Sequence, residues 1–560
     1  MSFFLTVFTA ALLLSTACVG IGALLAKTAT PAAMMVRRWA LFFFLCALVW
    51  FARFSASSFA PAIWLFVVVG VGGAISRIPW TRLLLFAAGT ALIAAVFAIP
   101  FFRYPGLVAY AHAGTDQWGY IGVSNWLVTH SVDDLPVLGE KMSLNWVWHI
   151  LATKERPLIF ISLATIAGAG GFTTVLAYYV LPVALMSGVF GCLCLTPGSF
   201  GFRNPLVNAG LALCVAMQPL VLWHFQLQFL GGTISALVIM MIVISLLHTS
   251  DEPVADWRFP AYACWLCILG AGLYSIKVAI PPLALTLALT GYRFWQKARR
   301  AGQWELPENL RSQRSECLVV LGVAAVTLLL IARLSPETLG SPYNGGMAGH
   351  RWAQIASVFG GGDLLPWYFV DGSLGWMDPV THHPAGSNWA IVILGAAIVW
   401  MGVLASRAWR FRRDAGLALT FVIFAGVLYV AAPPRGTHWS VSRSLPIFGA
   451  SLVVAMAAAA RGEKSRWIQV ATVGLCLLPL LRGAPRLCTF FLEPNNRFAD
   501  GQWDQLPAGN AWDALAYVNY YDDSRRLDWS GAPDMFRAMT YFLPDELRPH
   551  LVDGRPMPPR

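Results

Sequence analysis

The sequence has few charged residues for its length. Of its 560 residues, 12% are Asp, Glu, Lys or Arg, whereas 57% are hydrophobic. A soluble globular domain carries about twice that charged fraction. The mean hydropathy is +0.62, and long apolar runs recur from end to end. Together these features exclude an ordinary soluble enzyme and predict a polytopic membrane protein.

Three further features are missing from the sequence. It contains no Gly-rich phosphate loop, and no basic segment precedes the first apolar run at Phe3, so a cleaved signal peptide is not expected. The pairs Cys192/Cys194 and Cys264/Cys267 have no His or Cys companions that would complete a metal site. We therefore interpret the cysteines as packing residues, and no metal-ligand set is predicted.

About fourteen apolar runs are long enough to cross a bilayer as helices. They are residues 3–25, 39–55, 59–76, 83–102, 173–196, 207–224, 229–248, 259–275, 278–295, 317–333, 389–405, 415–432, 446–460 and 467–484. The predicted fold class is an all-α polytopic membrane protein. Residues 1–484 form its transmembrane domain, and residues 485–560 form a small soluble tail.

The distribution of Lys and Arg predicts the orientation of the spans. With the N-terminus outside, the inner connections hold most of these residues, as the positive-inside rule requires. Those before residue 260 are Lys27, Arg37, Arg38, Arg77, Arg82, Arg203 and Arg258. The net charge of +11 then reflects topology and attraction to anionic lipid, and no nucleic-acid partner is expected. Both termini are predicted on the outer side.

This orientation places the long polar segments outside. Loops 103–157 and 334–388 and the tail are rich in Trp, Tyr, His and Asp, and the short outer connection 433–445 carries two Arg, a His and several hydroxyls. Within the first loop, residues 121–128 and 144–152 are expected to form amphipathic helices in the membrane interface. The apolar stretch after Arg156-Pro157 is also expected to be interfacial. The chemistry is therefore predicted at the outer water–lipid boundary.

Asp116 is the candidate catalytic residue. It lies in the segment Gly-Thr-Asp-Gln-Trp-Gly-Tyr, and His112, Trp118 and Tyr120 surround it as in a sugar-binding cleft. The alternative is a turn residue or a helix N-cap, for which Asp is also common. Asp133-Asp134 is the competing acidic pair. A divalent-cation site at this pair stays open as an alternative.

A second group of residues has the chemistry to bind phosphate and sugar. Lys277 lies between two apolar runs, and Arg435 and Arg443 lie in the connection 433–445 together with His438. Guanidinium forks match phosphate oxygens, although all three cations could instead anchor helices at the interface. In loop 334–388, His350 stands beside aromatic residues that suit a saccharide.

These motifs resemble the GT-C superfamily of integral-membrane glycosyltransferases, which includes protein O-mannosyltransferases and the lipid A aminoarabinose transferase. The resemblance covers residues 83–484 and rests on Asp116, Arg156-Pro157, Lys277 and Arg443 in this order and sidedness. The chain departs from the family pattern in having four spans before the acidic loop instead of one. It also lacks an acidic doublet at position 116.

The resemblance implies a polyprenyl-phosphate sugar donor and a glycan, lipid or protein acceptor at the outer face of a bacterial inner membrane. Asp116 would act as general base in an inverting displacement, and Lys277, Arg443 and Arg435 would hold the leaving phosphate. Arg156 would also contact substrate, and no nucleotide cofactor is implied. Two alternatives stay open: a polysaccharide polymerase or ligase that uses a pyrophosphate-linked oligosaccharide, and a transporter of lipid-linked glycans.

Overall fold

The computed structural model describes most of the N-terminal half of the chain and selected parts of the rest. The described residues are 2–24, 31–103, 116–137, 147–148, 150–152, 157–195, 204–217, 237, 257–273, 308–334, 399–400, 403, 465–477, 551–552 and 555–556. Structural statements below concern these residues.

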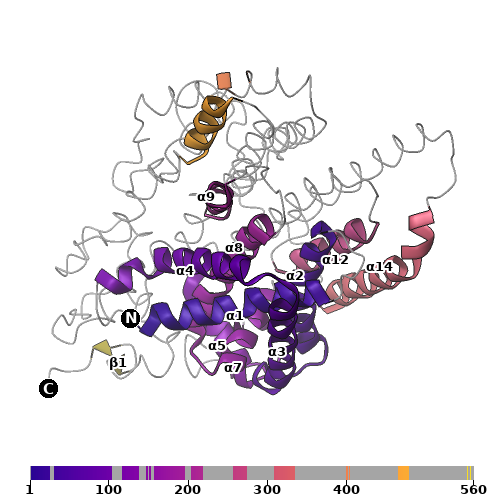
Figure 1. Cartoon of the computed structure of the whole chain (residues 1–560). Helices are drawn as coiled ribbons and strands as arrows, with labels where there is room; N and C mark the ends of the chain where they lie inside the picture. Colours follow the sequence, from indigo (N-terminus) through magenta and orange to yellow (C-terminus); the bar gives the residue numbers. More distant parts are fainter. Residues whose placement is uncertain are drawn as a thin grey trace, which may run out of the picture.

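The described chain is almost entirely helical (Figure 1). Its elements are α1 Ser2–Leu24, α2 Pro31–Phe51, the short 3-10 helix η1 Ser57–Phe59, α3 Ala60–Arg77, α4 Trp80–Arg103, α5 Asp116–Thr129, α7 Pro157–Gly170, α8 Thr174–Leu195, α9 Pro205–Ala216, α12 Arg258–Leu273 and α14 Glu308–Leu334. A further helix covers Arg466–Leu477. In the tail, β1 Leu551–Val552 pairs antiparallel with β2 Arg555–Pro556.

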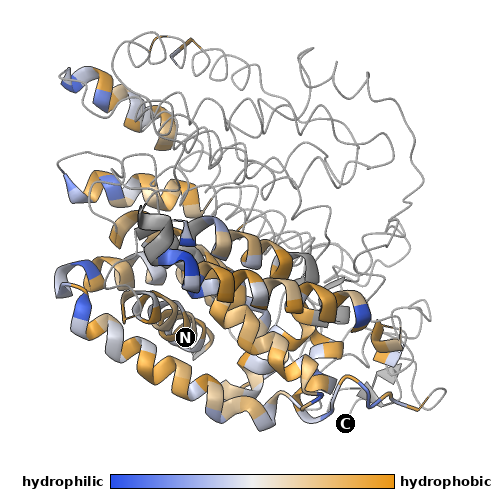
Figure 2. Cartoon of the chain, turned by 90° about the vertical axis from the view of Figure 1, so that its right-hand side faces the viewer, coloured by the Kyte–Doolittle hydropathy of each residue, from blue (hydrophilic) through white to orange (hydrophobic). Residues whose placement is uncertain are grey.

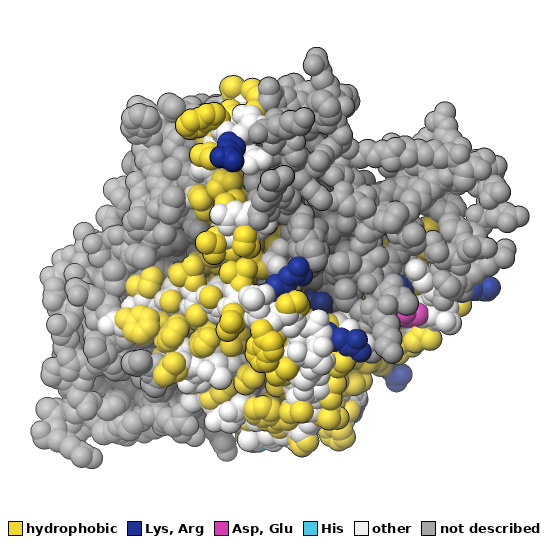
Figure 3. All heavy atoms as spheres, viewed as in Figure 1, with side chains coloured by type: hydrophobic (Ala, Val, Ile, Leu, Met, Phe, Trp, Pro, Cys, Tyr) yellow, Lys and Arg dark blue, Asp and Glu magenta, His cyan; other side chains and the backbone are white. Residues whose placement is uncertain are grey.

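Five described helices are long and apolar enough to cross a membrane, which confirms a helical membrane protein. They are Phe3–Leu24, Ser57–Arg77, Trp80–Ile99, Thr174–Leu195 and Gln313–Leu334. Each coincides with a predicted apolar run. The helices are mostly apolar along their length (Figure 2), and apolar side chains cover much of the described part of the face shown in Figure 3. The runs 229–248, 278–295, 415–432 and 446–460 lie outside the described residues, apart from Leu237.

Small residues bring α1 and α3 into close parallel contact. The backbone of Gly20 lies directly against Gly70, and Gly73 lies against Leu24, so the contact advances along both helices in the same direction. Such small residues let helix backbones approach closely where lipid supplies no hydrophobic force between helices.

The helix ends gather at two levels that match the predicted sides. At one end, Phe3 of α1 packs against Tyr179 of α8 with ring centroids 5.1 Å apart. At the other, Arg82 Nη1 of α4 donates to the Leu195 carbonyl at the end of α8 at 3.1 Å. We name these the outer end and the inner end after the predicted orientation. Arg82, which the charge pattern assigned to the inner side, therefore lies at the same end of the bundle as the C-terminus of α8.

Helix α7 lies in the centre of the bundle, and the prediction that it is interfacial is wrong. It contacts α2, α3, α5, α8, α12 and η1, and Leu158, Ile159, Leu163 and Ala164 are fully buried. Its 14 residues are too few to cross a hydrocarbon core alone. An interfacial helix would expose one polar face, whereas α7 is apolar on all sides.

Helix α7 runs along α2 toward the outer end. Its Ser162 and Thr165 lie beside Cys46, toward the C-terminal end of α2, and Gly168 lies against Ser57 of η1. Gly171 ends the helix with φ 63°, and the Phe172 N–H donates to the Ala167 carbonyl at 3.3 Å. This is the glycine C-terminus of a Schellman motif.

Helices α2 and α14 begin earlier than their apolar runs. Helix α2 begins at Pro31 instead of residue 39, and α14 begins at Glu308 instead of residue 317. Proline suits the first turn of a helix because it has no N–H to leave unpaired. The added turns contain Arg37 and Glu316, which pair with each other. Charged residues that pair inside the protein can thus extend a helix beyond the apolar run that is visible in the sequence.

The α1–α3 contact predicts unequal effects for two glycines of this helix pair. A Cβ added at Gly20 would overlap the Gly70 carbonyl and the Ala74 nitrogen, whereas one at Gly72 meets nothing within 4 Å. We expect Gly20→Ala to lower the free energy of unfolding by about 1–3 kcal/mol. Gly72→Ala should be neutral or stabilising by up to about 1 kcal/mol. Reversible unfolding in mixed micelles measures both, and equal values would refute this close packing.

Candidate functional site

Asp116 is the first residue of helix α5. The start of a helix was the alternative weighed for this residue, and it does not exclude a catalytic role. A carboxylate in the first turn of a helix is stabilised in its charged form by the N-terminal end of the helix dipole. The position therefore suits an ionised base.

Helix α5 runs inside the bundle, parallel to α7. Its Tyr120 packs against Phe160 near the start of α7, with ring centroids 5.5 Å apart. Its other end is fixed at the outer end, where the Ala56 N–H donates to the Leu127 carbonyl at 3.0 Å. Ile121, Val123 and Leu127 are buried, so the predicted interfacial helix at 121–128 is a bundle helix.

The direction of α5 places the backbone of Asp116 deeper than predicted. At about 1.5 Å per residue, Asp116 lies about 16 Å along the helix from Leu127, whereas a hydrocarbon core is about 30 Å thick. Its backbone is therefore near mid-bundle and not at the outer boundary. Trp118 follows in the same turn, and the ring of Tyr120 is only 4% exposed.

The acidic pair after α5 is engaged in local contacts. Asp133 Oδ2 lies 2.8 Å from Arg53 Nη1. The Ser131 N–H donates to Asp134 Oδ2 at 2.7 Å, and this bond lowers the pKa of the Asp134 carboxyl. The Trp126 indole N–H donates to the Asp134 carbonyl at 2.7 Å. These contacts close the loop at the outer end, and no group of three potential metal ligands occurs in the described parts of the chain.

An apolar cavity of about 430 Å³ lies beside α7 in the outer half of the bundle. Its lining comes mainly from α1, α3 and α7, and includes Leu5, Ala10, Trp64, Ile166 and Phe172. Leu5 and Trp64 are each 48% exposed, so the cavity opens on the lipid-facing surface. The Trp64 indole N–H donates to the Ala169 carbonyl at 2.8 Å and ties α3 to the end of α7.

The other predicted site residues lie outside the described residues. They are His112, Arg156, Lys277, His350, Arg435, His438 and Arg443. Their predicted roles stay predictions, as does the gathering of Lys277 and Arg443 at one donor site with Asp116.

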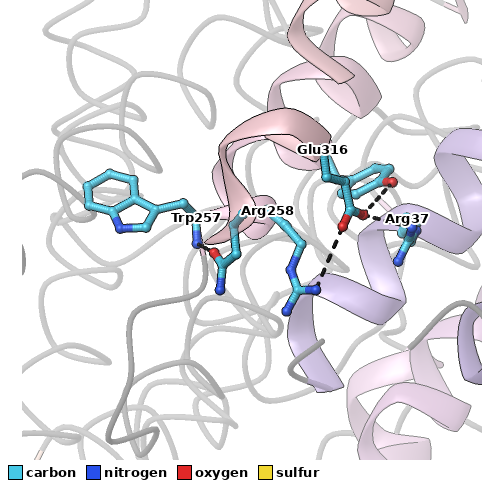
Figure 4. A network of polar contacts seen from close by, with 6 residues as sticks. Arg37, Trp257, Arg258 and Glu316 are labelled. Carbon is cyan, nitrogen blue, oxygen red and sulfur yellow. Dashed lines mark hydrogen bonds and ion pairs between the residues drawn. The ribbon is translucent and has the colours of Figure 1, made fainter. Parts of the chain in front are cut away.

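The structure also reveals a polar cluster at the inner end (Figure 4), which we call the Glu316 cluster. Arg37 Nη2 of α2 lies 2.7 Å from Glu316 Oε1 of α14, and Arg258 Nη1 of α12 lies 3.7 Å from Glu316 Oε2. The Tyr262 hydroxyl donates to Glu316 Oε1 at 3.1 Å, and the Arg37 guanidinium lies 4.9 Å from the centroid of the Tyr262 ring. One carboxylate thus joins three helices.

Sequence reasoning missed the Glu316 cluster because its partners lie far apart in the chain. The available signal was an acid at the start of the apolar run 317–333, on the side rich in Arg. Arg37 and Arg258 are largely buried, and buried charges require such pairing. The cluster holds the inner ends of α2, α12 and α14 together and makes no described contact with α5.

Comparison of the chain with protein-family models, curated proteins and solved structures finds no match.

Two acids that each pair with Arg should differ in their contribution to stability. The side chain of Glu316 is 30% exposed and that of Asp133 is 42% exposed. We expect Glu316→Gln to cost about 1–3 kcal/mol, because it removes the negative charge that pairs with Arg37 and Arg258; the partial exposure of Glu316 moderates the loss. Asp133→Asn should cost at most about 1 kcal/mol. Unfolding in mixed micelles tests both variants, and an unchanged Glu316→Gln protein would contradict the pairing.

Proposed function

We propose that the protein is a membrane glycosyltransferase that transfers a sugar from a polyprenyl-phosphate donor to a hydroxyl acceptor. One observation carries this proposal. Helix α7 lines an apolar cavity that opens toward lipid, and the same helix packs against α5, which begins at Asp116. Helix α7 is therefore next to both a site for a lipid chain and the helix that begins at the candidate base.

The cavity has the properties of a lipid-chain site. Its volume of about 430 Å³ is within the range of small-molecule pockets, about 300–1,000 Å³. An apolar chain gains little by leaving lipid for an apolar wall, so the cavity would orient the donor more than it would raise affinity. The sugar phosphate would then be held near α7 and α5.

In this proposal Asp116 takes the proton from the acceptor hydroxyl as that oxygen attacks the sugar, and the configuration at the sugar carbon is inverted. Charge grows on the departing phosphate oxygen at the same time. Lys277, Arg443 and Arg435 are proposed to stabilise that charge. The depth of the Asp116 backbone implies that the acceptor reaches between helices instead of reacting at the outer surface.

The parallel arrangement of α5 and α7 favours a second candidate, a transporter of an anionic lipid-linked glycan. Both helices begin inside the bundle and end at the outer end. In many transporters, the N-terminal ends of such partial helices point at an anionic substrate near the membrane midplane. This candidate uses the same residues without a covalent step.

Replacement of Asp116 by Asn tests the base assignment. We expect Asp116→Asn to fold and bind donor but to transfer labelled sugar at least about a hundredfold more slowly. The matched control is Asp133→Asn, because Asp133 pairs with Arg53 at the outer end; it should transfer at the wild-type rate. Membrane-extracted polyprenyl-phosphate sugars serve as donors.

The other outcomes separate the alternatives. Full transfer by Asp116→Asn would exclude Asp116 as base and favour the polymerase or ligase. No transfer by the wild type, together with movement of labelled donor across vesicle membranes, would favour the transporter.

Filling the cavity tests its role in donor binding. Ala10 lines the cavity, whereas Ala88 is exposed on α4. We expect Ala10→Trp to raise KM for a long-chain donor about tenfold with little change in kcat. The substitution would remove the same binding energy from the bound ground state and from the transition state. Ala88→Trp should match the wild type. A donor shortened to two isoprene units should respond much less, and equal KM increases for both donors would argue against a chain site.

A further inference from the structure

Arg38 of α2 is a buried cation at the inner end of the bundle. It is 8% exposed, and its Nε is shielded from solvent without a hydrogen-bond partner. In the described part of the chain, its guanidinium makes no ion pair. Its neighbour Arg37, in contrast, pairs with Glu316. Arg38 therefore carries a charge that the surrounding helices do not neutralise.

The bundle is built around this side chain. A Cβ added at Gly22 of α1 would overlap Arg38 Nε and lie 2.6 Å from its Cγ, so Gly22 leaves the space that the guanidinium occupies. Cys18 of α1 and Cys192 of α8 are its other close neighbours. Both are buried thiols that carry no compensating charge. A buried charge is costly unless it is paired, and no described side chain around Arg38 supplies the opposite charge.

The level of the guanidinium suits a phosphate at the membrane surface. Gly22 and Cys192 belong to the last turns of α1 and α8, which end at Leu24 and Leu195. Arg82 reaches the same level, where it binds the Leu195 carbonyl. Side chains on a helix lean toward its N-terminus, which for α2 is the inner end. The side chain of Arg38 is therefore expected to extend toward the inner end of the bundle.

We propose that Arg38 binds a phosphate group at the inner end of the bundle. The phosphate comes from the headgroup of an anionic inner-leaflet lipid or from phosphate in solution. A guanidinium can donate two parallel hydrogen bonds to phosphate oxygens, and the geometry of this fork favours phosphate over a simple halide. The site is distinct from the cavity and from Asp116, so it does not depend on the proposed glycosyl transfer.

The competing explanation is that the carbonyl ends of α1 and α8 alone stabilise Arg38. Cations near a helix C-terminus are favoured by the helix dipole. That explanation requires no ligand, and it predicts that phosphate binding does not depend on Arg38.

The test compares the full-length protein with Arg38→Met and with the matched control Arg77→Met. Arg77 is exposed at the same end of the bundle, at the close of α3. Native mass spectrometry of the detergent-purified proteins measures binding of short-chain phosphatidylglycerol, with a phosphate-free diacylglycerol for comparison. Equilibrium dialysis measures binding of labelled inorganic phosphate at constant ionic strength.

We expect Arg38→Met to bind the phosphate ligand about tenfold more weakly or worse, and Arg77→Met to bind it like the wild type. Dependence on Arg38 in the lipid measurement alone identifies a headgroup site, and dependence in the dialysis identifies a site for soluble phosphate. Equal binding by all three proteins in both measurements overturns the proposal.

A second variant keeps the test decisive if Arg38→Met does not fold. Arg38→Lys retains the charge but loses the planar fork, so it should bind phosphate several-fold more weakly than the wild type. Wild-type affinity in Arg38→Lys, with Arg77→Lys as control, would also overturn the proposal.

Discussion

Close contact between helices at small residues is the interaction on which the rest of the bundle depends. Lipid is as apolar as the helices, so helix association depends on van der Waals contact between closely fitting surfaces. Gly20 and Gly70 join α1 to α3, and Gly188 leaves room for the indole nitrogen of Trp39, 2.6 Å from the position of an added Cβ. These contacts draw the helices close enough to surround α7. The ion pairs Arg37–Glu316 and Arg53–Asp133 lie away from this packed interior, near the two ends of the bundle.

The enclosed helix α7 connects the features at the outer half of the bundle. It packs against α5, lines the cavity and ends at Gly171 next to η1. A helix that begins within a bundle has its first N–H groups away from water. Such a start is tolerated where protein groups or a polar cavity accept hydrogen bonds from these N–H groups. The first N–H groups of α5 and α7 are therefore backbone groups of the described structure that need hydrogen-bond partners inside the bundle.

The sequence predicted where the long helices lie in the chain better than it predicted which helices are buried in the bundle. Apolar runs were reliable because the bilayer sets a minimum helix length. The starts of α2 and α14 were missed because Arg37 and Glu316 satisfy each other across the bundle. The burial of α5 and α7 was missed because a short apolar segment has the same composition at an interface and in a core. The helix start at Asp116 was one of the two interpretations of this residue, but its depth depends on tertiary contacts.

The Glu316 cluster also bears on the order in which the protein is made. Arg37 and Arg258 are synthesised long before Glu316, which is the only acid of the cluster. Until α14 emerges from the ribosome, both cations lack the carboxylate that joins them in the folded protein, and positive residues are held toward the inner surface during insertion. Helices α2 and α12 contact each other directly, for example through Phe44 and Trp265, but the ion pairs that link both of them to α14 form only after Glu316 arrives. The carboxylate thus makes the completion of this side of the bundle a late event in biosynthesis.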